Sequence, residues 1–273
     1  MEHMSEPSTL FAAPGFDLKY VAIDSMHAGD LGIFQDAIGS LMWIEVYNKQ
    51  YHGSKNKGVV GLRALLANYY SANRERGYSQ FMPTIQQIVS KTLKYPCLKA
   101  KAAETRHLAN FCVLLANAHR HGGFGRPTFR FRATHFLSGR EDAHSGHLCN
   151  VFQGLADYHA ACAAEPFVKD DCTRSMYRFL QSFKELHDMW RDGRSLMEQT
   201  VAPFHMRPKA HMLHHLVEDQ LKLWGSPIRS WCYRDEDFVG SVKKIASKSK
   251  NPHTLESRLN EKLQLLGGLH MYV

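Results

Sequence analysis

The stretch that decides the fold is Leu18 to Trp43, LKYVAIDSMHAGDLGIFQDAIGSLMW. Its first six residues, LKYVAI, are mostly β-branched, aromatic or aliphatic, which favours a buried strand over residues 18–23. Asp24 would then stand at the C-terminal end of that strand, where open α/β sheets place their chemistry. Beyond Asp30, apolar residues recur at helical spacing and predict a helix: Leu31, Phe34, Ile38, Leu41 and Met42.

The two aspartates of this stretch have a simpler alternative interpretation. Aspartate is a preferred residue at helix N-termini because its carboxylate accepts hydrogen bonds from free backbone N–H groups. On this reading, Asp24 and Asp30 only cap the helix that follows. The residues themselves leave both interpretations open.

Composition bounds the class of protein. The 273 residues can bury one large core or two modest ones, and 44% hydrophobic with 22% charged residues is typical of a globular chain. No apolar run reaches the roughly 20 residues of a membrane span, and the N-terminus lacks a signal-peptide pattern. We therefore expect no membrane partner and an intracellular, not secreted, protein. Six cysteines without a C-x-x-C pair predict reduced thiols.

Positive charge is concentrated in one window. Residues 91–140 contain ten Lys or Arg against the single acid Glu104, although the whole chain carries only +8. Neutralising phosphates supplies much of the affinity for nucleic acid, so this window predicts DNA contacts, with a solvated basic face as the alternative. Phe129 and Phe131 alternate with two of its arginines, which would suit a clamp on a nucleic-acid backbone or stacking on an unpaired base; the alternative is that both phenylalanines belong to the core. The candidate DNA-binding residues are Lys99, Lys101, Arg106, Arg126, Arg130, Arg132 and Arg140.

Most of the remaining chain has helical periodicity. One helix is expected after Pro96, two amphipathic helices over residues 148–162 and 176–190, and another from Pro208 to Trp224. A short apolar piece, residues 228–233, is the second candidate strand. The predicted fold is therefore mainly α, with a small remnant of β-sheet.

The chain contains seventeen histidines, which are common metal ligands, so metal sites have to be considered. His211 and His215 stand at i and i+4, so they share one helical face and can hold a metal ion. They do not form an H-E-x-x-H motif, because Met212 and Leu213 occupy the intervening positions. This histidine pair is a candidate metal site, and it is the weaker alternative to the site at Asp24 and Glu236 that is described below.

Three separated segments resemble one family. IDSMHAGDLG near the start, KAKAAETRHLANFCVLLA in the middle, and PKAHMLHHL with WGSPIRSWCYRDEDFVGSVKK near the end are similar to the later part of eukaryotic cut-and-paste transposases of the CACTA type and their relatives. The resemblance spans roughly residues 16–266. It implies a partial ribonuclease-H-like core, residues 18–48 and 226–266, that carries a large helical insertion over residues 49–225.

The same resemblance implies metal-dependent DNA strand cleavage and transfer. Asp24 would match the second catalytic aspartate and Glu236 the glutamate, with Asp235 or Asp237 as alternatives to Glu236. Such carboxylates hold two Mg²⁺ (or Mn²⁺) ions about 4 Å apart, which activate a nucleophile and stabilise the leaving oxygen. The implied partner is DNA and the implied location is nuclear. An oligomer is compatible with the family.

One departure from the family pattern bears on activity. The family's first catalytic aspartate belongs to a strand that should precede residue 18, yet residues 1–17 form only an N-terminal extension here. We therefore expect a transposase-derived fragment that binds DNA, contains a single helical domain over residues 18–266 and a tail over 267–273, and is inactive alone. The alternatives are a non-catalytic helical nucleic-acid-binding module and a protein-interaction scaffold.

Overall fold

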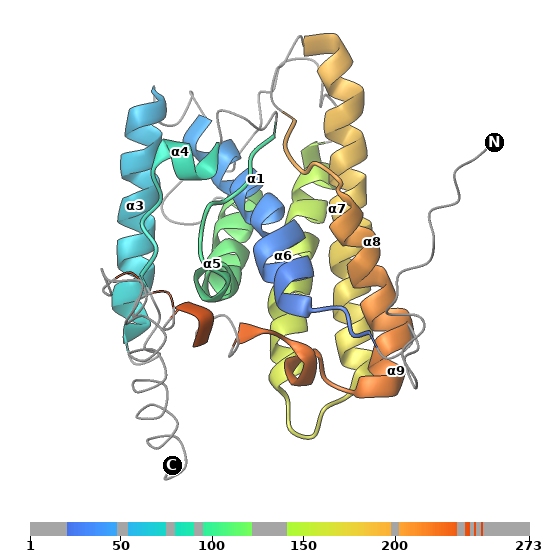
Figure 1. Ribbon diagram of the computed structural model, residues 1–273. Coiled ribbons are helices and arrows are strands. Elements are labelled where there is room, and N and C mark those ends of the chain that lie inside the picture. The colour runs from blue at the N-terminus through green and yellow to red at the C-terminus, as the bar shows by residue number, and fades with distance from the viewer. Residues whose placement is uncertain are drawn as a thin grey trace, which may run out of the picture. The chain divides into compact units, whose positions relative to one another are not determined.

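The computed structural model of the protein describes residues 21–47, 54–74, 80–89, 95–121, 141–197, 202–233, 238–240, 243 and 247. The chain divides into two compact units, Met1–Ser230 and Trp231–Val273. All the elements that follow belong to the first unit (Figure 1). They are the π-helical segment η3 (Met26–Ile33), α1 (Phe34–Tyr47), α3 (Lys55–Ala72), α4 (Ile85–Ile88), α5 (Ala102–His121), α6 (Glu141–Ala163), α7 (Lys169–Met197), α8 (Pro208–His215), η5 (Leu216–Gln220), α9 (Leu221–Trp224) and the 3₁₀ turn η6 (Pro227–Ser230).

Helix α1 is the centre of the first unit. It lies between α3 and the α6–α7 pair in Figure 1, and every residue from Gly32 to Val46 is buried. Its Phe34 ring makes edge-on contacts with Tyr158 of α6 and Phe179 of α7. The apolar spacing in this stretch predicted a helix, and this prediction is confirmed from Phe34 onward.

Helices α6 and α7 form a long antiparallel hairpin. The predicted apolar stripes line it: Val151, Phe152 and Leu155 on α6 face the core together with Met176, Phe179 and Phe183 on α7. Gly154 allows the two backbones to approach, because a Cβ atom there would lie 2.8 Å from the Phe179 nitrogen. The large apolar side chains on these helices are therefore core, as their spacing indicated.

Both predicted strands are absent from the described residues, so the sheet remnant is not formed there. Residues 21–24 form neither a helix nor a strand, and residues 227–230 form a 3₁₀ turn. A strand requires a partner strand for its hydrogen bonds, and the backbone of Val21 and Ile23 instead bonds to one side chain, that of Gln220. The mainly α class is confirmed.

The segment after Pro96 also differs from the prediction. The helix begins at Ala102 instead of directly after Pro96. The preceding segment crosses α1, where Leu98 N donates to Gln35 O at 3.0 Å and Gln35 Nε2 donates to Ala100 O at 2.7 Å. These tertiary hydrogen bonds replace the helical ones that residues 97–100 would otherwise make.

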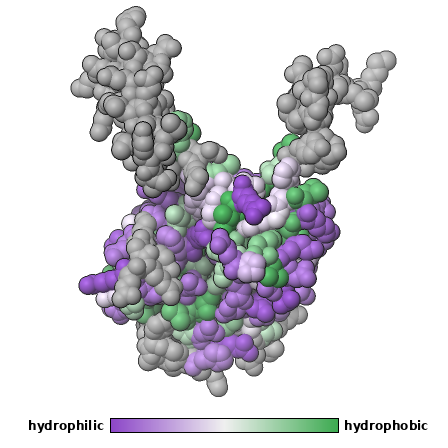
Figure 2. Space-filling model, turned by 90° about the horizontal axis from the view of Figure 1, so that it is seen from below, coloured by the Kyte–Doolittle hydropathy of each residue, from purple (hydrophilic) through white to green (hydrophobic). Residues whose placement is uncertain are grey.

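Among the described residues, no helix combines the length and the apolar composition needed to cross a membrane. On the face shown in Figure 2, hydrophilic residues surround smaller hydrophobic areas. Lys99 and Lys101 are among the exposed charged residues of the first unit.

Candidate functional site

The start of α8 packs against a break in the N-terminal helix. Leu31 and Gly32 leave helical geometry, with φ/ψ of −101°/16° and −130°/−120°. A break of this kind leaves backbone carbonyls without their helical partners. Lys209 Nζ donates to His27 O at 2.7 Å and to Leu31 O at 3.0 Å, so α8 supplies the missing donors.

These segments approach each other closely at the break, where a larger residue than glycine would displace the Lys209 side chain. A Cβ atom on Gly32 would lie 2.7 Å from Lys209 Cδ. Arg207, in extended geometry before Pro208, also donates from Nη2 to Gly32 O at 3.2 Å. Pro208 is suited to the first helical position, so α8 begins directly after this contact.

Gln220 holds the chain that leads into the break. Its Oε1 accepts from Ile23 N at 2.7 Å and its Nε2 donates to Val21 O at 3.0 Å. One primary amide therefore pairs with a peptide segment as a neighbouring strand would. This contact fixes the backbone immediately before Asp24.

Asp24 occupies a helix-capping position. Its Oδ1 accepts from Met26 N at 3.0 Å, its Oδ2 contacts His27 Nδ1, and its side chain is 17% exposed. This geometry is that of the capping interpretation. Glu236, Asp235 and Asp237 lie outside the described residues.

A single carboxylate is not enough for a two-metal site. In the described part of the chain, no three His, Cys, Asp or Glu side chains gather as metal ligands. The described residues therefore do not by themselves fit a pair of Mg²⁺ ions, and no catalytic step through metal follows from them.

A buried ion pair lies directly behind the Lys209 contact. Arg207 Nε donates to Asp36 Oδ2 at 2.5 Å, and the Asp36 side chain is fully buried. Asp36 Oδ1 has no hydrogen-bond partner among the described residues. Burial raises the pKa of Asp36 to about 6, although the Arg207 guanidinium acts in the opposite direction.

Cys97 is a neighbour of the same carboxyl group. Burial, and then the charge of Asp36, raises the pKa of this thiol to about 12. A nucleophilic cysteine requires a thiolate, which a pKa this high disfavours. Cys97 is therefore a structural residue of the core.

Asp30, the other aspartate of the opening stretch, is buried and pairs with a histidine instead of capping. His159 Nε2 lies 3.0 Å from Asp30 Oδ1. The His159 ring lines a hollow of about 310 Å³ between α5 and α6, together with Arg106 and His107. Burial and the nearby Arg106 lower the pKa of His107.

Three of the seven candidate DNA-binding residues lie in the described part of the chain. Lys99 and Lys101 are exposed and their ammonium groups pair with no described acid, while Arg106 is half-buried at the start of α5. The other four lie outside the described residues: Arg126, Arg130, Arg132 and Arg140.

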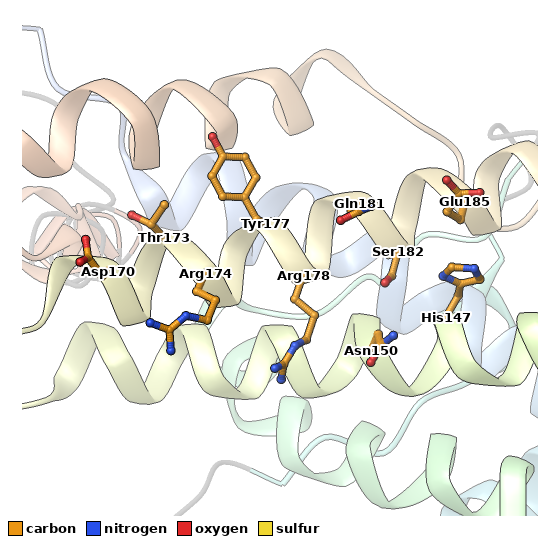
Figure 3. A pocket seen from close by; sticks show the side chains of 10 residues that line it. All are labelled: His147, Asn150, Asp170, Thr173, Arg174, Tyr177, Arg178, Gln181, Ser182 and Glu185. Atoms are coloured by element: carbon orange, nitrogen blue, oxygen red, sulfur yellow. The ribbon is translucent and has the colours of Figure 1, made fainter.

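A hollow of about 780 Å³ runs along α6 and α7 (Figure 3). Arg174 and Arg178 extend across it from α7 toward α6. Arg178 Nη1 lies 2.9 Å from Asp157 Oδ2, and Arg174 Nη1 lies 3.4 Å from Asp171 Oδ1. Both arginines of this groove are paired with aspartates, so they neutralise less phosphate charge than would the ammonium groups of Lys99 and Lys101, which pair with no described acid. The groove is therefore the weaker candidate for binding a polyanion.

The candidate metal pair on α8 is brought together. The Nε2 atoms of His211 and His215 lie 3.0 Å apart on the exposed face of the helix. His144 and His147 of α6 are separate from this pair, and the buried His144 Nε2 accepts from Trp190 Nε1 at 3.2 Å.

Comparison with known proteins finds no matching family model, no similar curated protein and no similar solved structure.

Sequence reasoning missed the residues that join the two ends of the first unit, namely Asp36, Arg207, Lys209 and Gln220. A partial signal was present for the first of them. Asp36 is an acid on an otherwise apolar stretch, which demands a buried cation, but the sequence does not indicate which one.

Proposed function

We propose that the chain is a transposase-derived DNA-binding protein. The observation that supports this most directly is that two of the segments carrying the resemblance lie against each other. IDSMHAGDLG and PKAHMLHHL are separated by more than 170 residues, yet Lys209 bonds to the carbonyls of His27 and Leu31. The contact therefore joins two of the segments that carry the resemblance, and the first of them contains the proposed catalytic Asp24.

The proposed DNA contacts begin at Lys99 and Lys101. Both side chains are exposed, and their backbone is held against α1 by the hydrogen bonds of Gln35. Cations on a fixed backbone lose less conformational freedom when they bind phosphates. Arg106 and the four arginines between residues 126 and 140 extend the same proposal.

Asp24 and Glu236 remain the proposed catalytic carboxylates, with Mg²⁺ or Mn²⁺ as the proposed cofactor. Asp24 is partly exposed, and Gln220 fixes the backbone that precedes it. A carboxylate held in this way is suited to bind a hard cation together with acids from elsewhere. A nuclear location belongs to the same proposal.

The experiment that tests DNA binding measures the salt dependence of duplex affinity by fluorescence anisotropy. Each phosphate contact contributes about 0.9 to the slope of log K against log salt, so Lys99→Ala/Lys101→Ala should lower the slope by about 1.8. The matched control is Lys57→Ala/Lys222→Ala, which removes the same charge from exposed positions of α3 and α9 and should leave the slope nearly unchanged.

Two results would count against this proposal. One is equal loss of affinity in both double variants, which would show that net charge alone governs binding. The other is no detectable binding by the wild-type chain at about 150 mM salt, which would favour the scaffold alternative.

A further inference from the structure

The exposed face of α8 and η5 carries three polar side chains in register. His211, His215 and Asp219 follow each other at intervals of four residues, which places them along one side of the helix. His215 Nδ1 lies 2.8 Å from Asp219 Oδ2, and His215 Nε2 lies 3.0 Å from His211 Nε2. His215 and Asp219 are thus at ion-pairing distance, and the two Nε2 atoms are within hydrogen-bonding distance of each other.

The spacing of the two nitrogens suits a shared metal ion. Imidazole nitrogens bind Zn²⁺ at about 2.0–2.1 Å. At such distances, two nitrogens 3.0 Å apart subtend about 91–97° at the ion. This angle is closer to square-planar or octahedral coordination, which Cu²⁺ and Ni²⁺ prefer, than to a tetrahedron.

Asp219 acts as the outer partner of such a site. When His215 Nδ1–H donates a hydrogen bond to the Asp219 carboxylate, the Nε2 atom of the neutral ring carries the lone pair that a metal needs. The same hydrogen bond orients the ring. Carboxylate–histidine–metal arrangements of this type are usual in protein metal sites.

The neighbouring His214 points elsewhere. Its Nε2 lies 3.5 Å from the Tyr177 hydroxyl, which itself contacts Glu218. The site therefore has two ligands from the described residues, and its other coordination positions are open to water or to another molecule.

The helix that carries the pair is rigidly held. Leu213, Leu216 and Val217 are buried on its opposite face, and Lys209 ties its first turn to η3. Metal binding would therefore not need to order the backbone.

We propose that His211 and His215 bind a divalent transition-metal ion of the class that prefers imidazole, with Asp219 positioning His215. Mg²⁺ and Ca²⁺ are excluded from this class because they prefer oxygen ligands. The site is distinct from the proposed carboxylate site and does not depend on DNA binding.

The test is a calorimetric titration of the full chain with Ni²⁺ and, separately, Cu²⁺, without DNA. His211→Gln and His215→Gln should each remove the tightest binding event, and Asp219→Asn should weaken it about tenfold. His214→Gln is the matched control on the same turn and should bind as the wild type does. Circular dichroism should show all four variants folded, since these side chains are exposed.

A second readout uses thermal unfolding. Ni²⁺ should raise the Tm of the wild type and of His214→Gln, and should not raise that of His211→Gln/His215→Gln, because only a ligand of the folded state stabilises it. Wild-type affinity in either single variant would overturn the proposal, as would an equal loss in His214→Gln.

Discussion

Arg207 and Asp36 are 171 positions apart in the sequence, and the guanidinium Nε of the first lies 2.5 Å from the carboxylate Oδ2 of the second. Asp36 is fully buried in α1, whereas the Arg207 side chain is 24% exposed. The pair joins the central helix to the segment that begins α8. Such a pair specifies this arrangement more than it stabilises it, since burying the charges costs free energy.

The first prediction concerns the pH dependence of stability. Burial raises the pKa of Asp36 from 3.8 to about 6, so between these values the folded state holds a proton that the unfolded state has released. The free energy of unfolding should therefore fall as pH rises through this window, by about 3 kcal/mol in total, and then level off. Urea unfolding at several pH values measures it.

Asp36→Asn provides the comparison for that experiment, because its amide does not titrate. The difference between wild type and variant isolates Asp36 from the other acids. An unchanged difference between about pH 4 and pH 7 would contradict the assigned pKa.

The second prediction removes the cation of the pair. Arg207→Met leaves the Asp36 carboxylate buried without its partner, which should cost about 3–5 kcal/mol at neutral pH. Arg178→Met is the control, because its pair with Asp157 is exposed and is worth less than about 1 kcal/mol. Equal effects of the two substitutions on urea unfolding would be inconsistent with this prediction.

The third prediction compares two glycines of α6. Gly154→Ala would place a Cβ atom 2.8 Å from Phe179 N and 2.9 Å from Ser175 O, so α7 must shift, at a cost of about 1–3 kcal/mol. A Cβ at Gly146 has nothing within 4 Å, and Gly146→Ala should gain up to about 1 kcal/mol from helix propensity. Chemical denaturation measures both, and the same sign for both would refute the close approach.

The fourth prediction concerns Gln220. Gln220→Ala removes both hydrogen bonds to residues 21 and 23, and should destabilise the protein by about 1–2 kcal/mol. Amide hydrogen exchange at Ile23 should accelerate in that variant. Gln220→Glu retains an acceptor for Ile23 N and should keep more protection there, while Gln181→Ala, an exposed position on α7, should change neither measurement.

The fifth prediction separates the capping role of Asp24 from a role in metal binding. Asparagine caps helices about as well as aspartate, so Asp24→Asn should change stability by less than about 0.5 kcal/mol, whereas Asp24→Ala should cost about 1 kcal/mol. Any Mg²⁺-dependent cleavage of DNA should be lost in both variants. Cleavage that survives in Asp24→Asn would remove this residue from the proposed catalytic site.

The helices could be predicted from the sequence because their information is local. Apolar residues at helical spacing indicate a buried face wherever the partner helix lies. Phe152 on α6 and Phe179 on α7 are examples, and both are buried. His211 and His215 could be paired for the same reason, since four residues make one helical turn. The strands failed because a strand is defined by a partner, and Gln220, not a strand, bonds to Val21 and Ile23.

The rest of the candidate site could not be derived from spacing. Lys209 meets His27 only because Gly32 breaks the helix and exposes its carbonyls, and neither event has a periodic signature. By sequence, Asp24 could be a catalytic carboxylate or a helix cap. Its hydrogen bond from Met26 N is the observation that identifies the cap.

The burial of α1 has a consequence for the timing of synthesis. This helix leaves the ribosome before the groups that cover Asp36 and Ser40, because Arg207 and Phe204 follow more than 160 residues later. At about 5–20 residues per second, translation of that interval takes roughly ten to thirty seconds. During this time an apolar helix containing a carboxylate lacks the groups that cover Asp36 and Ser40, so the nascent chain is a natural client for chaperones that shield newly made hydrophobic segments.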